Sequence, residues 1–574
     1  MLLSDDSLPA AILRFMSPPA PDTTMMNLLS RQSERFGERA ALSVREGDQW
    51  REVSYSSLAR QSGTLASILR DQGVRAGDRV AIISESRPEW AVGFFGAFHA
   101  GAVIVPLDPR ADQQELGLIL SDCQPVAILS SFNSREKAFA LASSHGIHMS
   151  VLLNGSDPRF LDSQATASGG IFEASRLSEE TALLAYTSGT TGRPKGVMIT
   201  PANLLFEMQA LASGHRLTDR DVFLSVLPLN HLLELTCGLL TVLYCGGQVV
   251  YSGTLLPEDL VDAMRERRVT TMIGVPLLFR VLQRAIESGA SRTGATRSWF
   301  RAAQTWARLV PSTKLRRLLF FPLHRRFGGR LVRLISGGSP LDSSVVNFFD
   351  LLGLPLYQGY GLTETSPVAT VNVPGFSRDR SVGRGMGSEI RIEKRPGDRE
   401  GEILIRGPQV MKGYYNDSAL TEEMIDSEGW FHSGDIGRLD GQGFLYVTGR
   451  LKDVIVLSDG RKVHPAEIES MLTKVNGIIK EACIVPTVCL QGERNGTEEV
   501  CAVIVPGDEF RRNTAPEKLR QDIENEVRKL SRSLRDFKRP SRVVIRDTDL
   551  PKTMTLKTRR AEVRKWLEQI DHES

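Results

Sequence analysis

Residues 183–200 read LLAYTSGTTGRPKGVMIT. An apolar run leads into a stretch rich in Gly and Thr, and VMIT follows as a second strand-like run. Glycines let the backbone approach an anion closely with its N–H groups turned toward it, hydroxyls add donors, and Lys195 adds a positive charge. The stretch therefore predicts a strand–loop–strand element that cradles phosphate. A flexible hairpin turn is the alternative for such a loop taken alone.

The loop does not fit a Walker phosphate loop. That motif has four residues between its first glycine and Gly-Lys, a Ser or Thr after the lysine, and a helix next. Here Lys195 is followed by Gly196 and a β-like run. The residues expected to contact phosphate are Thr187, Ser188, Gly189, Thr190, Thr191, Gly192 and Lys195.

The overall composition is that of an ordinary folded protein. The chain has 574 residues, which is too long for a single hydrophobic core. Of its residues 41% are hydrophobic and 24% are charged, and this composition excludes a disordered chain, collagen and a coiled coil. Lys+Arg minus Asp+Glu is 71 − 68 = +3, so no global field favours nucleic acid. The six cysteines form no C-x-x-C pair, which favours a reducing, cytoplasmic location.

Strand-like runs alternate with helical patterns through most of the chain, for example at 79–84, 102–107, 126–131 and 149–153. This alternation predicts α/β layers with largely parallel sheets. After about residue 380 the pattern changes to short strands and turns, and from Val454 it mixes strands with a charged helix.

Residues 90–107 contain no Asp, Glu, Lys or Arg and are long enough to be considered as a membrane span. Gly96, Gly101 and Pro106 interrupt them, so we expect a buried helix, a turn and a buried strand instead.

Further motifs follow the phosphate loop in a fixed order. They are SGGSPL at 336–341, YGLTET at 360–365, GE at 401–402 with Gly407, GYY at 413–415, WFHSGD at 430–435, GRLKD at 449–453, VHPAEIE at 463–469, and PKT at 551–553 with Lys557. Together with the loop, these motifs resemble the adenylate-forming (AMP-binding) superfamily, which includes acyl-CoA synthetases, nonribosomal-peptide adenylation domains and beetle luciferases. The resemblance extends from about residue 30 to 565.

The resemblance implies an α/β fold with a large multi-layer N-terminal domain, residues 1–451, whose sheets are flanked by helices. A small mobile α+β C-terminal domain, residues 453–574, would rotate about a hinge near Lys452. One state would serve adenylation with Lys557 turned inward, and the other would serve thioester formation.

The resemblance also implies the nucleotide site. Glu364 is expected to bind Mg²⁺ with help from Thr187, because a hard cation prefers carboxylate and phosphate oxygen. Asp435 would accept hydrogen bonds from the ribose hydroxyls, and Arg450 would meet ribose or phosphate. Tyr360 would stack on adenine. The neighbouring nucleotide-binding positions are Gly337, Gly338, Ser339, Gly361 and Thr363.

Two residues are expected to act at the acid. By resemblance Lys557 binds the carboxylate and the α-phosphate during adenylation. His231 occupies the family's acyl-site position, although a histidine in an apolar run is often a core residue. The runs at 232–240 and 269–282 are candidate walls of an acyl pocket, and equally resemble any buried helix.

Two departures point to the long-chain fatty-acyl-CoA ligase branch: Thr555-Leu556 precedes Lys557, and the loop at 458–460 is one residue longer than usual. We therefore expect an acid–thiol ligase that makes acyl-AMP from ATP and a fatty acid, with Mg²⁺, and transfers the acyl group to coenzyme A. Transfer to a carrier-protein phosphopantetheine is the main alternative. A luciferase-like oxidase and an inactive membrane-associated ligase fold are others, the last being disfavoured because Glu364, Asp435 and Lys557 are all present.

One segment is strongly basic, although the chain as a whole is nearly neutral. Residues 297–333 contain ten Lys or Arg and no Asp or Glu, with interspersed Trp and Phe. Such a stretch fits peripheral contact with the inner face of an anionic membrane, or equally the outer face of an ordinary helix pair. The sequence leaves acyl chain length and oligomeric state open.

Overall fold

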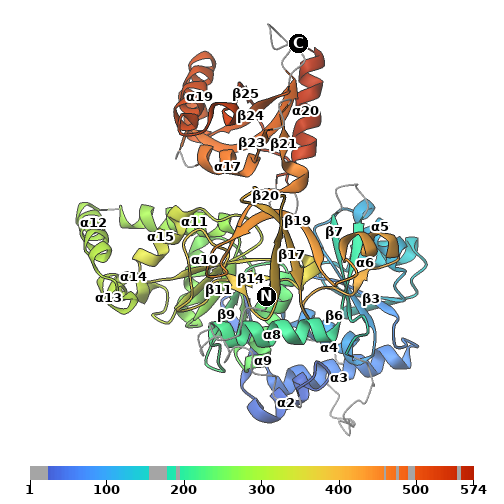
Figure 1. Cartoon of the computed structure of the whole chain (residues 1–574). Coiled ribbons are helices and arrows are strands. Elements are labelled where there is room, and N and C mark those ends of the chain that lie inside the picture. The colour runs from blue at the N-terminus through green and yellow to red at the C-terminus, as the bar shows by residue number, and fades with distance from the viewer. Residues whose placement is uncertain are drawn as a thin grey trace, which may run out of the picture. The chain divides into compact units, whose positions relative to one another are not determined.

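The computed structural model of the protein describes residues 23–153, 178–188, 194–291, 293–457, 461–473, 477–488, 498–552 and 558–573 (Figure 1). The chain divides into two compact units. The first contains residues 1–390 and 405–431, and the second contains residues 391–404 and 432–574. The hinge predicted near Lys452 falls within the second unit and stays a prediction.

In the described residues, a seven-stranded sheet of the first unit has the order β18-β8-β7-β4-β3-β5-β6. Strands β3 to β7 pair in parallel, whereas β8 is antiparallel to both β7 and β18. The strands are β3 (Arg79–Ile83), β4 (Val103–Leu107), β5 (Ala127–Ser131), β6 (Met149–Leu153), β7 (Leu183–Ser188), β8 (Pro194–Ile199) and β18 (Gly413–Tyr414). Helices α4 (Pro88–His99), α5 (Gln113–Cys123) and α6 (Arg135–Ser144) contact its strands, and α3 (Tyr55–Asp71) packs on α4.

A nine-stranded sheet has the order β15-β14-β13-β12-β11-β9-β10-β1-β2, with a parallel centre and antiparallel edges. Its strands are β1 (Ala40–Glu46), β2 (Gln49–Ser54), β9 (Val222–Ser225), β10 (Gln248–Tyr251), β11 (Thr271–Gly274), β12 (Arg333–Ser336), β13 (Leu356–Tyr360), β14 (Thr370–Val371) and β15 (Arg384–Gly385). The remaining helices of the unit are α2 (Leu28–Phe36), α8 (Pro201–His215), η2 (Leu233–Leu240), α9 (Thr241–Cys245), α10 (Pro257–Glu266), α11 (Pro276–Ala290), α12 (Gly294–Leu309), α13 (Thr313–Leu319), α14 (Phe321–Arg326), α15 (Ser343–Leu351), η3 (Thr363–Thr365) and α16 (Ser418–Met424).

The second unit contains a four-stranded sheet, β16-β17-β19-β20, the pair β21-β22, and a three-stranded sheet, β23-β24-β25. The strands are β16 (Glu389–Glu393), β17 (Gly401–Arg406), β19 (Phe431–Leu439), β20 (Leu445–Arg450), β21 (Ile455–Val456), β22 (Lys462–Val463), β23 (Ile479–Val488), β24 (Glu498–Pro506) and β25 (Arg542–Ile545). Its helices are η4 (Leu451–Asp453), α17 (Pro465–Leu472), α18 (Asp508–Asn513), α19 (Pro516–Ser531), η6 (Asp536–Lys538) and α20 (Arg560–Glu573).

These elements confirm the predicted class, α/β with a large N-terminal part and a smaller α+β C-terminal part. The uncharged stretch at 90–107 forms most of α4 and then β4, as predicted; α4 packs on α3 and on the strands of the seven-stranded sheet. Gly96 meets Leu65 where a Cβ would clash, which explains the glycine in this helix. Among the described residues no helix is long and apolar enough to cross a membrane.

Candidate active site

The predicted phosphate element is a β-hairpin stem. Strands β7 and β8 pair with Thr187 opposite Lys195 and Ser188 opposite Pro194. Gly189, Thr190, Thr191 and Gly192 lie outside the described residues, as does the side chain of Ser188. The stem therefore places Thr187 and Lys195 side by side at the base of the predicted phosphate loop.

Gly196 follows Lys195 for a steric reason. A Cβ at this position would lie 3.1 Å from the Tyr186 ring and 3.2 Å from the Cβ of Tyr415. Tyr186 is itself fixed because its hydroxyl donates a short hydrogen bond to Asp122 on α5. Close packing on both sides therefore holds the strand that carries Lys195.

Glu364 lies on η3, which contacts β8. The Tyr414 hydroxyl donates a hydrogen bond of 2.8 Å to Oε1 of Glu364, and the backbone N–H of Met411 donates to the Glu364 carbonyl at 2.9 Å. Tyr414 is on β18, opposite Val197 of β8, and its ring centroid is 5.5 Å from Nζ of Lys195. The structure thus brings Lys195 and Glu364, predicted from separate motifs, to the two sides of one tyrosine.

The donor set at this point suits a hard cation. No described residue hydrogen-bonds Oε2 of Glu364, so this oxygen can accept a ligand, and Thr187 offers a hydroxyl. Burial, and next the Glu364 charge, raise the pKa of Tyr414 above its ordinary value, which keeps the phenol protonated as a donor. Glu364 and Thr187 are therefore residues that fit Mg²⁺ chemically.

The predicted adenine-side residues follow two adjacent parallel strands. Gly337, Gly338 and Ser339 come after β12, and Tyr360 ends β13, which pairs with β12. Because the carboxyl ends of parallel strands meet at one edge of a sheet, these motifs share that edge, as ligand sites in α/β sheets commonly do.

Two glycines in these motifs are required by their surroundings or by their backbone conformation. A Cβ on Gly361 would lie 2.0 Å from the carbonyl oxygen of Pro367, so no side chain fits there. Gly338 has φ +85°, which favours glycine. Thr363, the next predicted contact, begins η3.

Asp435 and Arg450 form an ion pair in the second unit. They are directly opposite each other on β19 and β20, with Nε of Arg450 2.7 Å from Oδ1 of Asp435. The Asp435 side chain is 7% exposed and that of Arg450 is 49% exposed. Asp435 and Arg450 were both predicted from the sequence to contact the nucleotide, but the ion pair between them was not predicted.

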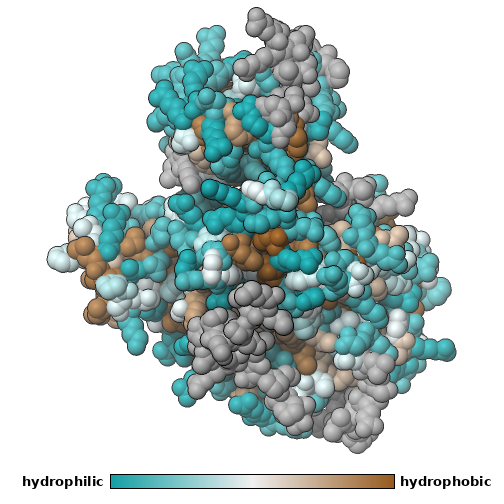
Figure 2. All heavy atoms as spheres, in the orientation of Figure 1, coloured by the Kyte–Doolittle hydropathy of each residue, from teal (hydrophilic) through white to brown (hydrophobic). Residues whose placement is uncertain are grey.

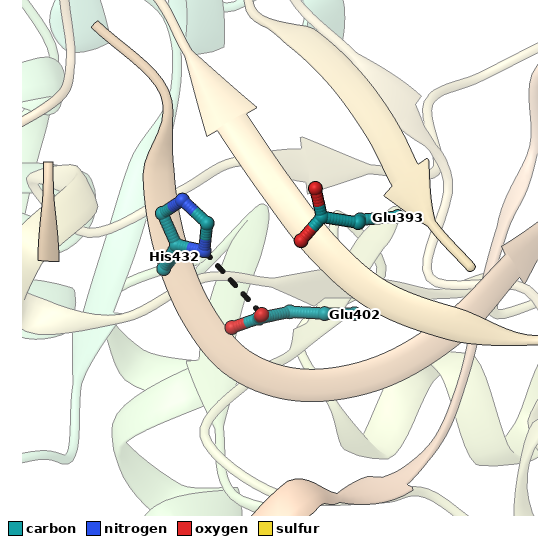
Figure 3. Close-up of side chains that lie close together, drawn as sticks. All are labelled: Glu393, Glu402 and His432. Carbon is teal, nitrogen blue, oxygen red and sulfur yellow. Dashed lines mark hydrogen bonds and ion pairs between the residues drawn. The ribbon is translucent and has the colours of Figure 1, made fainter. Parts of the chain in front are cut away.

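Glu393, Glu402 and His432, from three neighbouring strands, each place a potential metal-ligand atom within 4.8 Å of the others (Figure 3). Both oxygens of Glu402 already have partners, since Oε1 accepts from the Gly434 N–H at 2.9 Å and Oε2 lies 3.4 Å from Nδ1 of His432. These contacts hold the part of β19 that leads into Asp435.

His231 lies half-buried just before η2, a π-helix, and its carbonyl accepts from the Leu235 N–H. Three residues later, Glu234 is completely buried, and burial raises its pKa to about 8. Glu207 on α8 is also buried, with its pKa raised for the same reason. Sequence reasoning missed both acids; their signal is a single Glu inside an apolar run, at LLFEMQ and LLELTC.

Lys557 lies outside the described residues. The chain on either side of it is held, because Lys552 and Thr558 form an antiparallel β-bridge and the Arg559 N–H donates to the Pro551 carbonyl at 2.8 Å. The role of Lys557 stays a prediction.

A hairpin carrying Lys195 beside the Glu364 carboxylate, together with a smaller α+β unit, has the form predicted for an adenylate-forming enzyme. Residues 29–415 match the family model "AMP-binding enzyme", and residues 452–572 match "AMP-binding enzyme C-terminal domain". The chain belongs to the AMP-binding enzyme family. This confirms the family predicted from the motifs.

Two relatives and one solved structure are informative. A long-chain-fatty-acid–CoA ligase of Mycobacterium bovis is 33% identical over 463 residues, 76% of this chain and 75% of that protein. A feruloyl-CoA synthase of Amycolatopsis is 31% identical over 482 residues, 82% and 86% of the two chains. The crystal structure of ATP-bound MatB from Rhodopseudomonas palustris matches with TM-score 0.76 and 26% identity over 96% of this chain and 100% of that one. These relatives confirm the prediction of an acid–thiol ligase near the fatty-acyl-CoA ligases.

Proposed function

We propose that the enzyme converts a long-chain fatty acid to its CoA thioester using ATP. The acid's carboxylate oxygen attacks the α-phosphorus, acyl-AMP forms, and pyrophosphate leaves. The CoA thiol then loses its proton and attacks the acyl carbonyl, giving acyl-CoA and releasing AMP. The observation that carries this proposal is the placement of Lys195 and Glu364 on the two sides of Tyr414, beside the predicted phosphate loop.

In the first step the phosphates need their charge neutralised and the acid held in line. The loop at 187–195 would bind the leaving pyrophosphate, with Lys195 as its cation. Glu364 and Thr187 would hold Mg²⁺, which neutralises phosphate charge when bound. Tyr360, with the neighbouring residues of the adenine-side loop, would bind the base.

Asp435 would bind the ribose hydroxyls as a fixed acceptor. Its carboxylate is buried and held by Arg450 on one side, while the Ser433 hydroxyl accepts from the Asp435 N–H at 3.1 Å. Lys557 would bind the carboxylate and α-phosphate in the first step only, and rotation near Lys452 would replace it for the second.

The acid class is a fatty acid rather than an aromatic acid on two grounds. The M. bovis relative is named a long-chain-fatty-acid–CoA ligase, and the residues before Lys557 and at 458–460 depart from the short-acyl pattern. A hydroxycinnamic acid is the second candidate, because a feruloyl-CoA synthase is similarly related.

Acid-dependent exchange of labelled pyrophosphate into ATP tests the acid class. Acetate, benzoate, ferulate, octanoate and palmitate would be compared at matched concentration. We expect the highest rate with palmitate or octanoate. A maximum with ferulate or benzoate would overturn the fatty-acid assignment.

We also propose that α12 to α14 contact an anionic membrane, where such substrates partition. Exposed hydrophobic residues gather there, including Trp306 at 62%, Leu309 at 72% and Leu318 at 69% exposure, on the lobe that carries α12 and α13 (Figure 2). The exposed basic residues of this segment are Arg297, Arg301, Arg308, Lys314, Arg325, Arg326 and Arg330.

Three other basic residues of this segment have structural roles. Arg316 pairs with Asp350, Arg317 donates to the Leu331 carbonyl at 2.6 Å, and Arg333 pairs with buried Asp221 at 2.8 Å.

Sedimentation with phosphatidylglycerol and phosphatidylcholine vesicles tests the proposed membrane contact. Salt-sensitive binding to the anionic vesicles, lost in Trp306→Ser/Leu309→Ser, is expected; equal binding of this variant would contradict it.

A further inference from the structure

The short strand β18 adds an edge to the sheet that carries the phosphate hairpin. Gly413 and Tyr414 pair with Met198 and Val197 of β8. Hydrogen bonds continue this pairing on both sides, from the Lys412 N–H to the Met198 carbonyl at 3.0 Å and from the Tyr415 N–H to the Gly196 carbonyl at 2.8 Å. The backbone around Tyr414 is therefore fixed to the strand that begins beside Lys195.

The Tyr414 side chain is a buried connection between two charged groups. The residue is 4% exposed. Its hydroxyl donates to Oε1 of Glu364 at 2.8 Å, and its ring lies under the Lys195 ammonium at 5.5 Å, within the range of a cation–π contact. The adjacent Met411 N–H holds the Glu364 backbone as well.

The hydrogen bond from Tyr414 fixes the orientation of the Glu364 carboxylate. A phenol can donate one hydrogen bond, so it occupies one oxygen of Glu364 and fixes the plane of the carboxylate. No described residue hydrogen-bonds the other oxygen, Oε2. Groups that orient a metal-binding carboxylate in this manner commonly change metal affinity 10–100-fold when removed.

We propose that Tyr414 is a positioning residue of the adenylation site. It holds Glu364 with Oε2 available to the cation of the metal–nucleotide complex, and it holds the Lys195 ammonium beside the same complex. The proposal rests on the function proposed above for Glu364.

Calorimetric titration with ATP, in the presence of Mg²⁺ or of EDTA and without any acid, tests the proposal independently of turnover. Tyr414→Phe keeps the ring and removes only the hydroxyl. Tyr415→Phe is the matched control, because no described residue hydrogen-bonds the Tyr415 hydroxyl while the side chain packs near the same hairpin. Glu364→Gln and the double variant complete a cycle that isolates the Tyr414–Glu364 pair.

We expect Tyr414→Phe to reduce the affinity gained from Mg²⁺ by about 10-fold or more, with ATP binding in EDTA unchanged. Tyr415→Phe should behave as the parent protein, and the double variant should be no weaker than Glu364→Gln alone. An unchanged Mg²⁺ gain in Tyr414→Phe, an equal loss in Tyr415→Phe, or additive losses in the double variant would overturn the proposal. If Glu364→Gln itself keeps the full gain, the role of Glu364 is wrong, and the Tyr414 proposal is overturned with it.

Discussion

Glu234 is completely buried on η2, where its Oε1 lies so near Gly238 that a Cβ there would come within 2.7 Å. Burial raises the pKa of Glu234 to about 8, and the nearby Ser225 side chain and Leu227 backbone oppose this only in part. The folded protein therefore keeps this carboxyl neutral at pH 7. Glu234→Gln preserves the shape of the side chain and removes its ionisation.

The free-energy cost of burying Glu234 follows from its ionisation in the folded and in the unfolded chain. Below pH 4.5, the ordinary pKa, Glu234 is neutral in both the folded and the unfolded chain and costs nothing. As the pH rises, the unfolded chain ionises first, so folding becomes less favourable until the pH passes about 8. The cost is about 3 kcal/mol at pH 7 and approaches roughly 5 kcal/mol above pH 8, using 1.36 kcal/mol per pH unit.

Hydrogen exchange read on peptides that cover η2 measures this locally, which avoids assuming two-state unfolding of a two-unit chain. The opening free energy, corrected for intrinsic exchange at each pH, should fall in the parent relative to Glu234→Gln by roughly 3 kcal/mol between pH 5 and pH 8. Parallel pH dependences in the two proteins would refute the reasoning, because they would mean that Glu234 does not stay neutral when folded.

Three further changes have definite expected effects. Arg560→Ala should destabilise the second unit by about 3–5 kcal/mol in denaturant unfolding, because it leaves the Glu469 carboxylate of a mostly buried, bidentate ion pair without its partner. Gly196→Ala should slow pyrophosphate exchange at least several-fold, since its Cβ would press on the Tyr186 ring and displace the strand of Lys195. Lys557→Ala should abolish pyrophosphate exchange and spare thioester formation from supplied acyl-adenylate.

The changes at Arg560 and Gly196 each have a matched control. Arg559→Ala removes an exposed ion pair with Glu562 and should cost under about 1 kcal/mol; an equal loss would show that burial is not the cause. Gly294→Ala adds a Cβ with nothing within 4 Å and should leave exchange unchanged. Near-parental exchange in Gly196→Ala or in Lys557→Ala would contradict the corresponding role.

The sequence allowed prediction of those elements that depend mainly on residues close together in the chain. The phosphate hairpin was predictable because apolar strands flank a run of Gly and Thr, and the actual β7–β8 stem has the predicted form. The helix and strand at 90–107 followed from buried apolar runs interrupted by glycine. The order of motifs predicted the family, which the family models confirm.

Long-range pairings could not be predicted in the same way. Tyr414 is 50 residues from Glu364 in sequence, and the link exists only because β18 pairs with β8 and η3 lies beside it. Asp435 and Arg450 were expected to act on the nucleotide separately, whereas antiparallel pairing places them opposite each other. The complete burial of Glu234 could not be predicted, since sequence alone does not distinguish a buried acid within an apolar run from one that reaches solvent.

The central claim is most directly tested by AMP formation from ATP and palmitate, measured with and without CoA together with the thioester formed. The account predicts that turnover requires CoA and yields one AMP for each acyl-CoA. Pyrophosphate release with little AMP, unaffected by CoA, would contradict it and point to transfer of the acyl group to a carrier protein.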